Sequence, residues 1–212
     1  MLTEQLGDLG SAADVLRRVD AGARACGLPP SAALIGDWFG SRAIIAPTVE
    51  VAPVDPADVF DVRPGEGDGA VGGGWIGYLS YPDPGADGTP PRIPEAAGGW
   101  TDCVLRLDRD GTWWYESLSG AALPGWLESA LATRPPEDHC VIDWRMPDAA
   151  EHRAGVLSCL EAIRAGEVYQ ACVCTQFTGT ATGSPLHFFA EAVTRTTPGR
   201  ASIRCAQAST CV

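Results

Sequence analysis

The stretch EAIRAGEVYQACVCTQF, residues 161–177, predicts the end of a helix and the start of a strand. Gly166 follows an apolar helical pattern, and glycine is common just beyond a helix C-terminus. The apolar and cysteine residues that come next predict a strand over 167–178. Gln170 stands near its start, where a buried strand favours Val or Ile. Gln170 is therefore either a polar residue at a strand edge or a functional amide.

Helical patterns lie on both sides of this stretch. Asp148, with Glu151 three residues later, predicts a capped helix start, and the helix carries apolar residues at helical spacing: Val156, Leu157, Leu160 and Ile163. Ser184 and Pro185 predict the start of another helix, which ends before Pro198. The succession of helix, strand and helix predicts an α+β fold.

The first 134 residues also alternate between helices and strands. Ser11 predicts the N-cap of a helix that ends at Gly27, and residues 123–132 predict a short helix. Residues 32–39 and 42–51 predict a hairpin at the edge of a sheet, and residues 102–108 and 113–117 predict a second hairpin.

Glycine and proline mark the connections. A glycine-rich connection over 62–74 leads into a strand over 74–81, and residues 82–99 predict a long exposed loop. The connection lacks the lysine of a phosphate-binding loop. The Pro-Pro pair within 133–139 predicts a change of subdomain.

Composition limits the classes of function. The 212 residues have a net charge of −12, which disfavours nucleic acid as a partner, and they contain no lysine. The N-terminus has no export signal and no window is apolar enough to cross a membrane, so we expect a cytoplasmic protein without a membrane partner. We therefore expect its eight cysteines to be reduced and mostly buried, with no metal bound by them.

Three segments together resemble a known family. GGWIGYLSY at 73–81, EAIRAGEVYQACVCTQF at 161–177 and PLHFFAEAVTRTTPGR at 185–200 resemble component I of aminodeoxychorismate synthase, among the chorismate-utilising enzymes. The resemblance implies an α+β N-terminal subdomain over 1–134 and the start of a chorismate-binding domain of sheets and helices over 147–200. It also implies chorismate as the substrate and a glutaminase subunit as the partner.

The resemblance gives Gln170 a role. Relatives that attack chorismate with water carry a lysine at this position, and relatives that attack with ammonia carry a glutamine. Water needs a general base to become a nucleophile, whereas neutral ammonia needs only an uncharged group that orients it. Gln170 is therefore the expected catalytic residue, although Ala171 and Cys172 differ from the usual neighbours.

Another element of the family helps to bind tryptophan. Where relatives have Leu-Leu-x-Ser, this chain has residues 34–37, with Asp37 in place of the serine, followed by SRAIIA at 41–46. Asp37 and Arg42 are the candidate residues of such a site. The serine is absent, so a strand that packs without a ligand is the other interpretation.

The end of the chain departs from the family. Residues 201–212 show neither a strand nor a helix period, so we expect a frameshift near residue 201 and a truncated product. In the family, later residues supply a lysine that attacks chorismate and carboxylates that bind Mg²⁺, so we expect no Mg²⁺ to bind this chain, little activity from it alone, and poor solubility. Sequencing of the gene beyond codon 200 tests the frameshift.

Three functions remain open at this point. The first is component I of aminodeoxychorismate synthase, which aminates chorismate on the route to para-aminobenzoate and folate. The second is component I of anthranilate synthase, on the route to tryptophan. The third is a non-catalytic remnant that at most binds a partner subunit.

Overall fold

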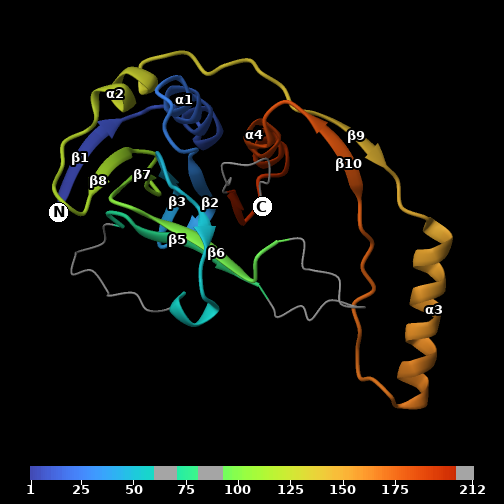
Figure 1. Cartoon of the computed structure of the whole chain (residues 1–212). Coiled ribbons are helices and arrows are strands. Elements are labelled where there is room, and N and C mark those ends of the chain that lie inside the picture. The colour runs from blue at the N-terminus through green and yellow to red at the C-terminus, as the bar shows by residue number, and fades with distance from the viewer. Residues whose placement is uncertain (60–70, 81–92, 204–212) are drawn as a thin grey trace. The chain divides into compact units, whose positions relative to one another are not determined.

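The computed structural model describes residues 1–59, 71–80 and 93–203, and the fold is α+β (Figure 1). The chain forms two compact units. The first contains Met1–Asp138 together with the chain from Pro185, and the second is His139–Ser184. The sequence predicts a boundary after residue 134 and one domain over 147–200. In the structure the chain from Pro185 belongs to the first unit, because residues 200–203 form a strand that pairs with residues 33–36.

A six-stranded antiparallel sheet forms the centre of the first unit. Both predicted hairpins are confirmed, but the first one does not lie at a sheet edge, since its two strands are interior. The prediction that residues from 201 form no strand is wrong for Ala201–Ile203, which pair with Ala33–Ile35. The first strand was not predicted. In spatial order the strands are β1 (Leu2–Gly7), β8 (Trp113–Ser117), β7 (Cys103–Leu107), β3 (Ser41–Ala46), β2 (Ala32–Trp38) and β11 (Arg200–Ile203).

A second sheet contains β4 (Ala52–Pro53), β6 (Ala96–Thr101) and β5 (Gly74–Leu79), and the single turn η1 (Pro56–Asp58) follows β4. The predicted strand over 74–81 is confirmed over Gly74–Leu79, but the predicted loop is wrong over 96–99, which belong to β6. Residues 82–92 of that loop and 62–70 of the glycine-rich connection lie outside the described residues.

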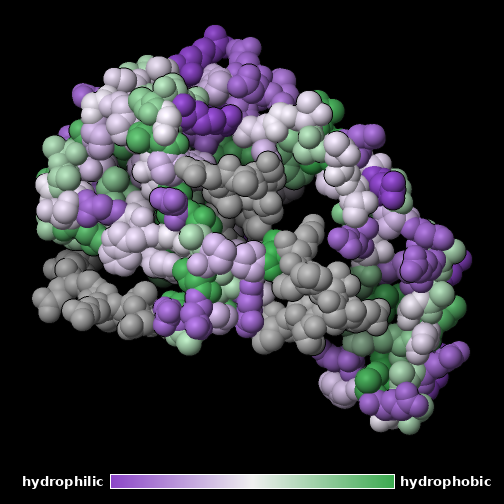
Figure 2. Space-filling model, in the orientation of Figure 1, coloured by the Kyte–Doolittle hydropathy of each residue, from purple (hydrophilic) through white to green (hydrophobic). Residues whose placement is uncertain are grey.

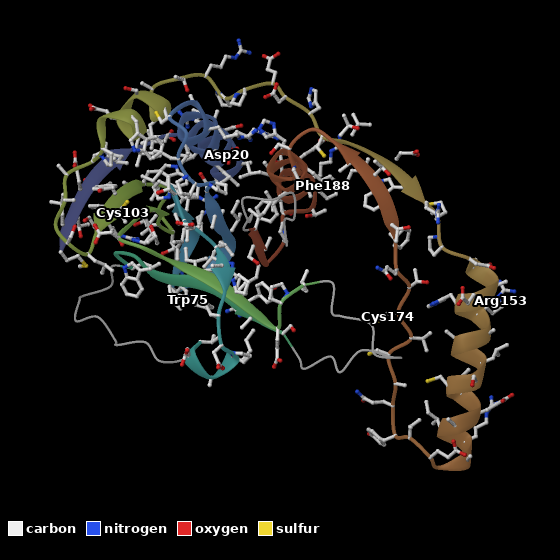
Figure 3. All side chains as sticks on the ribbon, viewed as in Figure 1. Asp20, Trp75, Cys103, Arg153, Cys174 and Phe188 are labelled. Carbon is white, nitrogen blue, oxygen red and sulfur yellow. The ribbon has the colours of Figure 1, made fainter. Side chains whose placement is uncertain are left out.

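Two glycines explain how β6 forms from a loop-like sequence. Gly77 of β5 lies opposite Gly98 of β6, and a Cβ atom on either would collide with the ring of Trp75, which is labelled in Figure 3. The indole therefore occupies the space that side chains would fill.

Three helices cover one face of the six-stranded sheet: α1 (Ala12–Ala25), α2 (Gly125–Leu131) and α4 (Pro185–Thr196). The side chain of Ser11 accepts a hydrogen bond of 3.1 Å from the amide of Asp14, which confirms the predicted N-cap of α1. The apolar side chains between helices and sheet form the main core, whose fully buried members include Leu16, Val19, Ile45, Leu105, Trp113, Leu127 and Leu186.

A buried arginine joins two helices. Arg18 of α1 donates to the carbonyl oxygen of Leu131 at 2.6 Å and to that of Leu9, so it connects the end of α2 and the loop before α1. Burial lowers the pKa of its guanidinium. Both carbonyls need a donor because they are at element ends, where backbone partners are missing.

The second unit consists of β9 (Val141–Arg145), α3 (Ala149–Ala165) and β10 (Thr178–Thr182). Asp148 caps α3, and Gly166 ends it in the left-handed conformation (φ 76°), as the sequence predicts. The predicted strand over 167–178 is wrong: residues 167–177 pair with no strand of the described chain, and β10 begins at Thr178. No residue of 139–184 is buried, and hydrophobic side chains remain at its surface (Figure 2).

The prediction of buried cysteines is also wrong. Cys26, Cys172 and Cys174 are exposed, and the other described ones, Cys103, Cys140 and Cys159, are half-buried. Cys172 and Cys174 lie on the segment without a strand, where no sheet covers them, and Figure 3 shows Cys174 there. All six are free thiols. Across the described ranges, no helix has the length and apolar character to cross a membrane.

We expect stability at alkaline pH to depend on Tyr115 of β8. Burial raises the pKa of its phenol to about 12, and its hydroxyl donates to the carbonyl oxygens of Ala121 and Ala122. Because the ordinary pKa of tyrosine is about 10, the stabilisation is complete below pH ~10 and is lost as the pH rises toward ~12, by up to about 2 kcal/mol. Urea unfolding between pH 8 and 11.5 should show a steeper loss for the parent protein than for Tyr115→Phe. Parallel curves would contradict this expectation.

Candidate functional site

The first unit contains an open cavity of about 1080 Å³. Four segments that are distant in the sequence line it: the loop before α1, the β2–β3 hairpin, the β7–β8 turn and the chain between α4 and β11. The residues that matter for its chemistry are Asp37, Arg42, Arg109, Asp110, Thr197 and Gly36. The cavity therefore combines Asp37 and Arg42, the two candidates from the sequence.

A bulge in β2 directs this part of the chain toward the cavity. The β2–β3 register shifts between Ile35 and Trp38, and Gly36 has a φ of +110°. The amide of Asp37 donates to the carbonyl oxygen of Gly199 at 2.7 Å, and Nε of Arg200 donates to the carbonyl oxygen of Asp37 at 2.8 Å. Bulges of this kind occur where a strand must re-aim a side chain.

The charged side chains of the cavity are only partly paired. Nη2 of Arg109 lies 3.3 Å from Oδ1 of Asp37, and Nε of Arg109 donates to the carbonyl oxygen of Gly40 at 3.2 Å. Both members of the ion pair are mostly exposed, so it contributes little stability. Arg42 is exposed and has no hydrogen bond or ion pair within the described part of the chain. Its guanidinium is therefore available to an anionic group.

Helix ends add a second set of polar groups. The N-terminus of α1 at Ala12 and Ala13 lines the cavity, and so does the C-terminus of α4 at Val193 and Thr194. The first carries partial positive charge and the second partial negative charge. Thr197 follows α4 with a φ of 41°, which is uncommon for residues other than glycine. The helix ends thus add partial charges of opposite sign to the wall of the cavity.

Gln170 lies in the second unit, within the extended segment that leaves α3. Its side chain is exposed, and the neighbouring Tyr169 is 94% exposed. In the same segment, Val173 lies against Gly155, where an added Cβ would be 3.2 Å from a methyl group of the valine. Gln170 thus carries an exposed, uncharged amide on the segment that follows α3.

The described residues do not fit a magnesium site. No group of three or more His, Cys, Asp or Glu side chains within residues 1–59, 71–80 and 93–203 could hold a metal ion. The chain also has no lysine that could act as a nucleophile. Asp102, whose pKa is lowered mainly by the hydroxyl of Ser119, is fully used in hydrogen bonds with Ser117 and Ser119.

Sequence reasoning missed Arg109, Asp110 and Thr197 as cavity residues. Arg109 and Asp110 lie in the turn of the second predicted hairpin, and Thr197 lies at the end of the helix that is predicted to end before Pro198. Their approach to Asp37 depends on pairing between β2, β3, β7 and β11, which no local pattern reveals. No protein-family model matches the chain, and no curated protein matches it significantly.

Proposed function

We propose that this chain is part of a component I of aminodeoxychorismate synthase, acting in the cytoplasm with a glutaminase subunit that supplies ammonia. The observation that carries the proposal is the unit formed by α3, Gly166 and Gln170. The helix ends in a left-handed glycine, and four residues later an uncharged amide is exposed. The proposal also rests on the resemblance of residues 73–81, 161–177 and 185–200 to that family.

In this proposal Gln170 orients ammonia beside chorismate. Its amide oxygen accepts a hydrogen bond from ammonia, and the nitrogen lone pair remains free to attack. A lysine in this place would instead serve, as its neutral amine, as the general base that water needs. The uncharged side chain therefore favours the nucleophile that needs no deprotonation.

The chain does not supply every group that the reaction needs. A covalent step through lysine cannot take place on 212 residues that contain none. We therefore expect amination only when a polypeptide that carries the later, lysine-bearing part of the family's sequence is added.

The test is an assay with chorismate, Mg²⁺ and ammonium in which products are separated and identified by mass. We expect 4-amino-4-deoxychorismate from the chain mixed with the lysine-bearing polypeptide, and none from either alone. Gln170→Leu should lower the rate about 100-fold or more, because orientation of the nucleophile is lost. Gln176→Leu, an exposed glutamine of the same segment, is the matched control and should leave the rate unchanged.

Each other outcome selects an alternative. Anthranilate as the product would favour component I of anthranilate synthase. Equal rates for Gln170→Leu and Gln176→Leu would contradict a catalytic role for Gln170. No product in any mixture would favour a non-catalytic remnant that binds a partner subunit. Tryptophan remains the candidate ligand of the cavity that Asp37 and Arg42 line, since acidic and basic side chains both line that cavity.

A further inference from the structure

One edge of β10 has no strand partner among the described residues. β10 pairs only with β9 within the described chain, and all five of its residues are exposed. Its sequence, Thr-Gly-Thr-Ala-Thr, has no charge and no proline. Charged residues and prolines on edge strands commonly prevent pairing with another chain, and β10 lacks both. This edge therefore offers a row of backbone donors and acceptors to a strand of another chain.

The sequence of β10 is nearly the same in both directions. When two copies run antiparallel with Thr180 opposite Thr180, Thr178 lies opposite Thr182 and Gly179 lies opposite Ala181. Threonine pairs across strands are favourable, and the small residues leave no clash. A two-fold interface requires a surface that complements itself. The strand meets this requirement in one register.

The hairpin also has one apolar face. By the alternation of strand side chains, Ile142 and Trp144 share that face with Phe177, and the rings of Trp144 and Phe177 meet edge to face with centroids 6.5 Å apart. Trp144 is 48% exposed and Phe177 is 54% exposed. A second hairpin beside the first would extend this face across a four-stranded sheet.

Charge does not oppose this contact locally. Residues 139–184 contain five acidic side chains and three arginines, a net charge of −2 out of −12 for the chain. β10 itself contains no charged side chain. Most of the repulsion between two copies therefore comes from outside this unit, and salt screens it.

We propose that two copies of this chain associate through their β10 strands, antiparallel about Thr180, and form a four-stranded sheet in the order β9, β10, β10 and β9. A strand of five residues is a small interface, so the association is reversible and depends on concentration. It strengthens with salt. This inference does not depend on the proposed enzymatic function.

The first test is sedimentation velocity over a range of protein concentrations, at low and at high salt. Thr180→Lys places two like charges opposite each other on the two-fold axis and should weaken the dimer about tenfold or more. Ser129→Lys, on the exposed side of α2, adds the same charge elsewhere and should not weaken it. Equal effects of the two variants, or a monomer at every concentration, would overturn the proposal.

The second test identifies the register. Opposed residues of antiparallel strands have Cα atoms about 4.5–5.5 Å apart, within the range of a disulfide. Thr180→Cys should therefore cross-link to its copy, in a background of Cys172→Ser and Cys174→Ser. Thr182→Cys should not, because it lies about 13 Å from its copy in this register, but it should cross-link to Thr178→Cys when the two variants are mixed. Efficient disulfide formation between two copies of Thr182→Cys would overturn the proposed register. A dimer that forms no disulfide at residue 180 would place the contact on another surface, such as α3, and would overturn the proposal.

Discussion

Replacement of Glu116 by alanine is expected to lower the free energy of unfolding of the first unit by about 3–5 kcal/mol. Glu116 of β8 is fully buried, and Oε1 lies 2.5 Å from Nε of Arg106. Its Oε2 accepts hydrogen bonds from the amides of Val71 and Gly72, at 2.7 and 2.8 Å. Removal of the carboxylate leaves a largely buried guanidinium and two amides without their partner, which is the costly case for a buried pair.

Two variants separate the causes of this effect. Glu116→Gln retains an acceptor of the same size and should cost about 1–2 kcal/mol. Asp37→Ala removes an exposed ion pair and should cost less than about 1 kcal/mol. Urea unfolding followed by tryptophan fluorescence measures the free energy of unfolding of Glu116→Ala and of these two variants, because Trp113 is fully buried in the core of this unit. A loss at Glu116→Ala no larger than that at Asp37→Ala would mean that burial does not strengthen this pair.

Replacement of Gly36 by alanine is expected to detach β11 from the six-stranded sheet. The added Cβ would meet the carbonyl oxygen of Gly199 well inside van der Waals contact, and its φ of +110° is one that residues with a side chain rarely adopt. Arg200 pairs with Gly36 in the register, so the clash falls on the strand pairing itself. Strain and lost pairing together should cost about 2–4 kcal/mol.

Gly40→Ala is the matched control for this variant. Gly40 also has a positive φ, of 74°, but an added Cβ has nothing within 4 Å. Its strain alone should cost about 1–2 kcal/mol. Hydrogen exchange of the amides of residues 200–203 should become fast in Gly36→Ala and stay slow in Gly40→Ala. Unchanged protection in both variants would show that the backbone adapts, and the wall of the cavity at Gly36 would then tolerate a side chain.

Helix limits were largely predictable because they depend on residues close in sequence. Ser11 and Asp148 cap their helices, and Gly166 ends α3, because each side chain or backbone conformation acts on amides or carbonyls within four residues. The two hairpins of the six-stranded sheet follow from turns of the same local kind. Such signals do not need the rest of the protein.

Strand partners and burial were less predictable. Residues 167–177 have the composition of a buried strand, but a strand needs a neighbour, and none pairs with this segment within the described chain. Residues 96–99 have the composition of a loop, yet they form β6 because Gly98 lies beneath the indole of Trp75. In both cases a distant residue decides the outcome.

The candidate site shows the same division. Local chemistry sets the helices, the hairpins, the α+β class and the residue types at positions 37, 42 and 170, so these follow from the sequence. Long-range strand pairing brings Asp37 and Arg42 into one cavity with Arg109 and Thr197. The physical reason is that backbone hydrogen bonds between β2, β3, β7 and β11 bring together segments more than 150 residues apart, and every strand presents the same donors and acceptors whatever its side chains.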